Sequence, residues 1–263
     1  GTTTVEGANI AKHANGCDYW IIGKEVGNNT FKTYYVSSSG VNLTPVISSV
    51  GSNTPNAWGT IKVSPNNTLI ALANSVSSAR IQVFDFNNNT GILTFKFSDN
   101  VGGYSSEFSA DNNILYSTIL SDPNIYQYDL TVANNADFQA SRTIIGTTAN
   151  TIGYRMCALQ MAPNGKIYAA LHGLNYIGVI NNPNTLGVGC NYVDNGQSIA
   201  GVNSFSGTNM ISTLGLPAFP SFFITQPVEI ISQSLCFDDQ TIFQISDTAE
   251  VDLIEWTITD INL

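Results

Sequence analysis

The sequence predicts an all-β chain folded largely as a β-propeller, and three observations lead to this prediction. A tight-turn pattern recurs four times, at intervals of 51, 45 and 53 residues. Each turn is flanked by short runs of β-branched and aromatic residues. Charged residues make up only 11% of the chain, and its 30 asparagines and 22 glycines disfavour long helices. A repeat of this length with four short strands has the size of one propeller blade.

The recurring turn sets the order of the strands in each repeat. Asn and Gly tolerate the positive φ of tight hairpins, and Pro presets the turn. The four turns are His13–Gly16, Ser64–Asn67, Ser109–Asn112 and Ala162–Gly165. One short strand precedes each turn, and further strands follow it. The following strands are expected at residues 18–24, 31–36, 68–73, 81–86, 114–119, 125–130, 166–171 and 176–181.

The length of the repeat region predicts an incomplete ring. Residues 1–225 are assigned to the propeller, and blades of roughly 45–50 residues give about five of them. A propeller has to close, because an open sheet edge exposes unpaired backbone groups. We therefore expect the chain to begin inside a ring of seven blades. The open edge would be covered by residues 1–10, by the tail, by other modules of the same polypeptide or by another chain.

The last residues of the chain differ in charge from the rest. Residues 229–263 contain eight acidic residues and no Lys or Arg, and Gln226-Pro227 marks a break before them. Alternation over residues 241–245 and the later Trp256 are typical of an early part of a β-sandwich. Residues 226–263 are therefore predicted to be the beginning of an Ig/PKD-like module. The alternative is a single domain with an acidic edge.

Several segments resemble the WD40-like or YVTN-like β-propeller of large secreted surface proteins of Bacteroidetes. They are residues 11–20, 37–41, 44–48, 159–168, 177–184, 189–192 and 215–223. In that family the propeller precedes PKD or other Ig-like modules, and a type IX secretion signal often ends the chain. The resemblance implies an extracellular or cell-surface location, associated with the outer membrane.

Composition and motifs exclude several classes of function. With pI near 4.3 and nine Lys+Arg, the chain is not expected to bind nucleic acid, and it has no apolar run of about 20 residues that could insert into a membrane. It contains neither a G-x-S-x-G elbow nor a phosphate-binding glycine loop. No catalytic residue and no cofactor is therefore predicted. Calcium is a minor alternative, with oxygens from Asp99-Asn100 or Asp111–Asn113.

The predicted function is a non-enzymatic binding or adhesion scaffold for glycans or surface proteins. Tyr154 and the pair Asn175-Tyr176 are the candidate ligand contacts, because flat aromatic faces with amide neighbours suit sugar rings. One alternative is a lactonase-like or glycan-cleaving propeller enzyme, with acidic residues around a metal at the pore. Another alternative is a structural spacer of a giant adhesin, with no ligand of its own.

Cys157 and Cys190 leave two interpretations open. A disulfide between them would agree with the resemblance to secreted proteins. It would also require the Cys190 segment to cross back over its blade, because the outer strands of a blade lie far from the inner one. The other interpretation is two buried thiols that act as small apolar residues.

Overall fold

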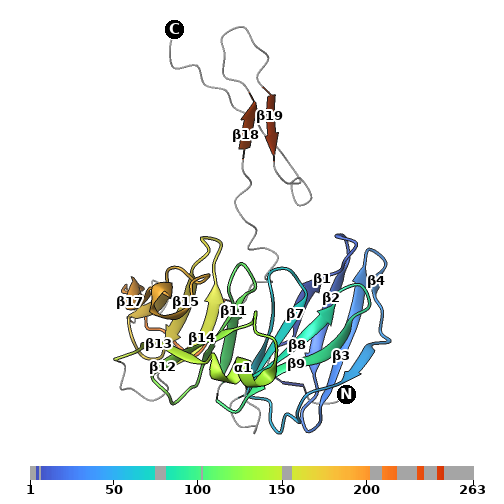
Figure 1. Cartoon of the computed structure of the whole chain (residues 1–263), viewed down its shortest axis with the longest axis horizontal. Helices are drawn as coiled ribbons and strands as arrows, with labels where there is room; N and C mark the ends of the chain where they lie inside the picture. Colours follow the sequence, from blue (N-terminus) through green and yellow to red (C-terminus); the bar gives the residue numbers. More distant parts are fainter. Residues whose placement is uncertain are drawn as a thin grey trace. The chain divides into compact units, whose positions relative to one another are not determined.

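The computed structural model divides the chain into two units, Gly1–Ile224 and Thr225–Leu263. It describes residues 4–5, 7–74, 81–101, 103–149, 156–201, 209–217, 230–233 and 242–245. The larger unit consists of antiparallel sheets that follow one another in chain order (Figure 1). No helix among these residues is long and apolar enough to span a membrane.

Four consecutive sheets, here called blades 1 to 4, form the larger unit. In each blade the strands pair antiparallel in the order of the sequence, and in blade 1 two short strands share the outer position. Blade 1 holds β1 (Asn9–Lys12), β2 (Tyr19–Lys24), β3 (Thr30–Ser37), β4 (Gly40–Val41) and β5 (Val46–Ser49); blade 2 holds β6 (Gly59–Val63), β7 (Leu69–Asn74), β8 (Ile81–Asn87) and β9 (Ile92–Asp99); blade 3 holds β10 (Ser105–Phe108), β11 (Ile114–Thr118), β12 (Asn124–Asp129) and β13 (Thr143–Thr147); blade 4 holds β14 (Met156–Met161), β15 (Ile167–Leu171), β16 (Tyr176–Ile180) and β17 (Tyr192–Ser198).

The described structure confirms the all-β prediction and the eight predicted strands, but it corrects two details. The described part of the larger unit contains four blades where about five were predicted, because residues 199–201 and 209–217, which follow β17, form a crossover and no further sheet. Between β12 and β13 the chain also forms a short helix, α1 (Asn135–Ala140), at a place where no element was predicted. Asn134 caps this helix, since its side chain accepts a hydrogen bond from the Asp137 amide at 3.1 Å.

The core lies between neighbouring blades. Alternate residues of a strand point to opposite faces, so each blade offers apolar side chains to the blade on either side. Between blades 1 and 2, for example, Trp20, Ile22 and Phe31 meet Ile70 and Phe84 in one buried cluster. Two further clusters lie between blades 2 and 3 and between blades 3 and 4. Each blade is therefore stabilised by its neighbours.

The connection between the third and fourth strands of a blade docks on the preceding blade. In blade 2 this connection is the turn Asn87–Gly91 between β8 and β9. Trp20 Nε1 of blade 1 donates to the Asn88 carbonyl at 2.8 Å, and Thr33 Oγ1 donates to the Gly91 carbonyl at 2.7 Å. We call this arrangement the reach-back contact.

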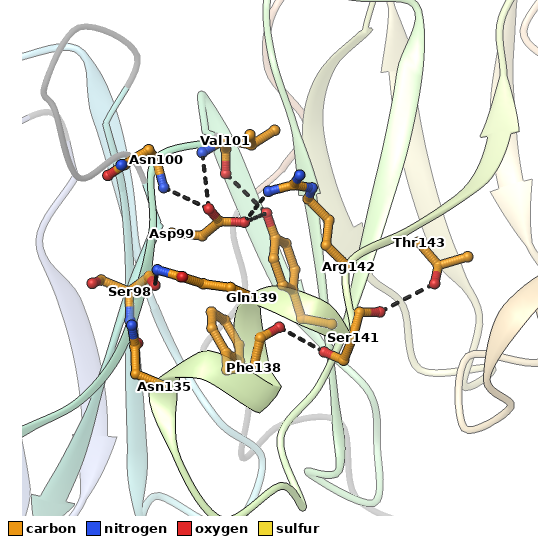
Figure 2. Close-up of polar contacts among 11 residues, drawn as sticks. Ser98, Asp99, Asn100, Val101, Asn135, Phe138, Gln139, Ser141, Arg142 and Thr143 are labelled. Carbon is orange, nitrogen blue, oxygen red and sulfur yellow. Dashed lines mark hydrogen bonds and ion pairs between the residues drawn. The ribbon is translucent and has the colours of Figure 1, made fainter.

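In blade 3 the reach-back contact is made by α1 and the residues that follow it (Figure 2). Phe138 stacks on Phe97 of blade 2, with ring centroids 4.9 Å apart. Arg142 Nη1 donates to Asp99 Oδ2 at 2.5 Å, and Asp99 is buried at the end of β9. Gln139 Nε2 donates to the Ser98 carbonyl at 3.0 Å. A hydrophobic stack and an ion pair thus fix blade 3 on blade 2.

Blade 4 repeats the contact on blade 3 through the segment that leads into η1 (Gly187–Cys190). Tyr116 Oη donates to the Pro183 carbonyl at 2.8 Å. Gln127 Nε2 donates to the Thr185 carbonyl at 2.9 Å, and Gln127 Oε1 accepts from the Gly187 amide at 2.7 Å. The reach-back contact therefore recurs at all three interfaces between blades 1 and 4.

A second recurring feature is the crossover that leaves each blade toward the next one. In blades 1, 3 and 4 a buried hydroxyl residue anchors it to the hairpin between the second and third strands, namely Thr54, Thr148 and Ser212, respectively. Their amides donate to the carbonyls of Asn28, Pro123 and Leu174, at 3.1, 2.8 and 2.7 Å. Thr54 lies five residues after the end of β5, whereas Ser212 lies fourteen residues after the end of β17. The crossover of blade 4 is thus much the longest of these three.

In the smaller unit, β18 (Ile230–Gln233) and β19 (Ile242–Ile245) form an antiparallel pair. β19 coincides with the alternating stretch at 241–245. Trp256 lies outside the described residues, and an Ig/PKD-like module stays a prediction.

The start of β6 requires glycine. Gly59 has φ +158°, and a Cβ there would lie 2.0 Å from the Ala73 carbonyl oxygen. Because backbone cannot give way as a side chain can, we expect Gly59→Ala to lower the free energy of unfolding by about 2–4 kcal/mol in urea denaturation. The control is Gly23→Ala in β2, where the nearest atom lies 4.0 Å away. Equal effects of the two substitutions would contradict the assignment.

Candidate functional site

Charged and polar side chains meet on the inner strands of blades 2, 3 and 4. Lys62 of β6, Glu107 of β10 and Gln160 of β14 each lie two residues before the recurring turn. Lys62 Nζ donates to Glu107 Oε2 at 2.8 Å and to Gln160 Oε1 at 2.7 Å. All three residues are buried. We call this triad the inner-strand network.

The Glu107 carboxylate is occupied by contacts within the protein. Its Oε2 accepts hydrogen bonds from Lys62 Nζ and from the Met161 amide at 3.0 Å, and its Oε1 accepts from the Phe108 amide at 3.1 Å. A buried carboxylate with a cationic partner and backbone donors is held as a stable ion pair. The network therefore joins three blades and offers no free acid or base.

A pocket of about 410 Å³ opens beside the crossover of blade 4. The long crossover creates it, because this segment leaves the blade after β17 and returns to the β15–β16 hairpin. Met210 and Ile211 expose 44% and 55% of their surface there. We call it the crossover pocket. Its described lining residues are Gly173, Leu174, Asn175, Ala200, Gly201, Asn209, Met210 and Ile211.

The described lining of the crossover pocket carries no titratable side chain. Two side-chain amides, Asn175 and Asn209, stand among apolar groups and backbone. The backbone carbonyl of Asn175 is used by the Ile199 amide at 2.9 Å, whereas its side-chain amide makes no hydrogen bond to a described residue. Such a surface can bind an uncharged polar ligand, and it holds no group for acid–base or nucleophilic chemistry.

The structure separates the predicted ligand contacts. Asn175 is exposed and lines the crossover pocket. Tyr176 begins β16 and packs half-buried against the core between blades 3 and 4. Tyr154 lies outside the described residues. The other lining residues lie in the β15–β16 hairpin and in the crossover after β17, where no repeated sequence pattern marks them, so the sequence analysis did not predict them.

Cys157 and Cys190 are both buried free thiols in this structure. Burial raises the pKa of Cys157 to about 11, and burial also raises the pKa of Cys190. Thiols in this environment are protonated at neutral pH and contribute as small apolar residues.

Both of the calcium candidates are engaged in local contacts. Asp99 pairs with Arg142, and its Oδ1 accepts from the Asn100 amide at 2.7 Å. Asp111 Oδ1 accepts from Ser109 Oγ at 2.6 Å and from the Asn113 amide at 3.2 Å, within the recurring turn. These carboxylates stabilise a blade interface and a turn, respectively.

The chain matches no protein-family profile and no curated protein. Among solved structures it is similar to a "putative 6-phosphogluconolactonase" from Bacteroides uniformis, with 15% identity and a TM-score of 0.45 over 81% of this chain and 60% of that one. It is also similar to an auxiliary nutrient binding protein from Bacteroides thetaiotaomicron, with 12% identity and a TM-score of 0.43 over 80% of this chain and 42% of that one. A third similar structure is a β-propeller domain from Myceliophteria thermophila, with 9% identity and a TM-score of 0.40 over 64% of this chain and 48% of that one. The chain spans less than two thirds of each, and at these values none carries an argument about activity.

The inner-strand network predicts non-additive mutations. Glu107→Gln keeps a hydrogen-bond acceptor but leaves the charge of Lys62 buried and unpaired, so we expect a loss of about 3 kcal/mol in the free energy of unfolding. Adding Lys62→Met removes that charge and should restore at least about 1 kcal/mol. Urea denaturation of the two single variants and the double variant measures the coupling. Strictly additive losses would show that Lys62 and Glu107 do not act as a pair.

A buried lysine closes the crossover of blade 1. Lys24 is fully buried, and its Nζ donates to the Glu25 carbonyl at 3.1 Å and to the Asn28 carbonyl, which also anchors Thr54. Burial lowers the pKa of Lys24 to about 8, against the opposing charge of Glu25. The protonated form is therefore disfavoured in the folded state relative to the unfolded state.

The lowered pKa of Lys24 predicts a pH dependence. Below pH 8 the folded chain keeps a buried charge, whereas between about pH 8 and 10.5 only the unfolded chain still holds the proton. The free energy of unfolding of the wild type should therefore rise relative to Lys24→Met, by about 2 kcal/mol after allowance for solvent screening. Urea titrations at pH 7.5 and 10.5 measure this. If the difference in the free energy of unfolding between the wild type and Lys24→Met does not change with pH, the prediction is wrong.

Proposed function

We propose that the chain is a non-enzymatic binding module of a secreted cell-surface protein and that the crossover pocket binds glycans. The observation that carries this proposal is the neutral lining of the pocket. Side-chain amides can donate to and accept from sugar hydroxyls, and the apolar faces of Leu174 and Met210 can pack against the ring. The cell-surface location rests on the resemblance to secreted propellers.

The enzymatic alternative is a lactonase-like or glycan-cleaving propeller. Such an enzyme needs a carboxylate or a metal site facing its substrate. Within the described ranges no group of three or more His, Cys, Asp and Glu residues could hold a metal ion. Glu107, the acidic residue on the described inner strands, is paired with Lys62. The inner-strand network therefore supports a structural role.

Glycan-array binding tests the proposal and separates it from a spacer role. We expect the intact chain to bind a subset of neutral glycans. Asn175→Ala should weaken that binding at least fivefold, because it removes hydrogen bonds that only the ligand completes. The matched control is Asn53→Ala, which changes an exposed asparagine in the crossover of blade 1 and should bind like the wild type. No binding to any glycan would favour the spacer, and equal binding by Asn175→Ala would exclude the crossover pocket.

A further inference from the structure

The described lining of the crossover pocket contains a single side chain that a peroxide can oxidise, the thioether of Met210. Met210 is 44% exposed, whereas Met156 and Met161, the two other methionines of the chain, are 0% and 1% exposed in the core between blades 3 and 4. An oxidant has to touch the sulfur atom in order to react with it. A peroxide in the solvent therefore reaches the thioether in the pocket and is kept from the two in the core.

Backbone hydrogen bonds on both sides hold Met210 in the wall of the pocket. Its amide donates to the Gly201 carbonyl at 2.9 Å, and two residues later the Ser212 amide donates to the Leu174 carbonyl at 2.7 Å. The end of the side chain lies over Gly201, since a Cβ on that glycine would come within 3.4 Å of Met210 Cε. Gly201 and Leu174 both line the pocket. The thioether is therefore part of the apolar surface that a bound sugar would contact.

We propose that Met210 is a modification site, and that its oxidation by a peroxide weakens the binding of glycans to the crossover pocket. The inference rests on the proposed function, because it concerns the regulation of the same site. One oxygen of the peroxide is transferred to Met210 Sδ, so that an S–O bond forms and the O–O bond breaks. The sulfur loses two electrons, and the second oxygen leaves as water with both protons of the peroxide. Methionine sulfoxide reductases reverse the modification.

The oxidation changes the polarity of the wall without changing its charge. A thioether is apolar and flexible, whereas a sulfoxide has a polar S–O bond. Covering that bond with the apolar face of a sugar ring costs free energy unless the oxygen finds a hydrogen-bond donor. We therefore expect the oxidised chain to bind glycans at least about fivefold more weakly than the reduced chain.

Peptide mapping and the glycan array test the proposal on the intact chain. The wild type is treated with increasing hydrogen peroxide, and mass spectrometry locates each added oxygen atom. We expect Met210 to be converted to the sulfoxide before Met156 and Met161. The same array, probed before and after treatment, should show the loss of binding at the peroxide concentration that converts Met210. Treatment with the reductases for both sulfoxide epimers should restore binding.

Met210→Leu is the matched control, because it keeps an apolar side chain that a peroxide does not oxidise. The variant also keeps every cysteine, including the exposed Cys17. Whatever its level of binding before treatment, peroxide should leave that level unchanged. If Met210→Leu loses binding on treatment as the wild type does, oxidation elsewhere is the cause and the proposal is wrong.

Two further results would overturn the proposal. One is oxidation of Met156 and Met161 as fast as Met210, and the other is undiminished binding by a wild type whose Met210 is fully oxidised. Both leave the proposed function intact, because the untreated chain still binds. A chain that binds no glycan before peroxide is added instead shows that the proposed function has failed, and the inference about Met210 fails with it.

Discussion

Every feature of the larger unit depends on one constraint, which is that a four-stranded sheet cannot bury two apolar faces alone. The chain meets this constraint by packing each blade against its neighbours and by fixing each pair with a reach-back contact. The contacts differ in chemistry, from the Trp20–Asn88 hydrogen bond to the Phe97–Phe138 stack with the Asp99–Arg142 ion pair. Their position in the blade is nevertheless the same, so the repeat is conserved in geometry rather than in residue type.

The same repeat explains where a binding site can arise. A crossover has to lead from the outer strand of a blade back to an inner strand, and a buried hydroxyl residue anchors the crossovers of blades 1, 3 and 4. Where the crossover is short, as at Thr54, a buried lysine and its carbonyl partners close the space. Where it is long, as before Ser212, a pocket forms whose lining comes from two loops. The proposed binding function thus lies in a segment whose length the propeller architecture leaves free.

The sequence predicted the strands well because Asn-Gly and Pro-Asn turns recur beside apolar runs. The described residues hold four blades where about five were predicted, since dividing length by repeat size counts the crossover of blade 4 as a sheet. Many reach-back hydrogen bonds are accepted by backbone carbonyls such as those of Asn88 and Pro183. Because every residue has a backbone carbonyl, the sequence could not predict these contacts. The inner-strand network had a signal: aligning the turns places Lys62, Glu107 and Gln160 at one repeat position. Asn175 was found from its amide chemistry, whereas its partners in the pocket required the fold.

The most direct test asks whether the reach-back contacts couple all four blades into one cooperative unit. In a chain whose only tryptophan is Trp20, obtained with Trp58→Phe and Trp256→Phe, fluorescence reports on blade 1 while far-UV circular dichroism reports on all strands. Phe138→Ala removes the stack between blades 2 and 3. We expect both urea transitions to move together to lower urea, by a loss of about 3 kcal/mol. If the urea transition measured by Trp20 fluorescence keeps its wild-type midpoint in Phe138→Ala, the blades are not coupled into one unit.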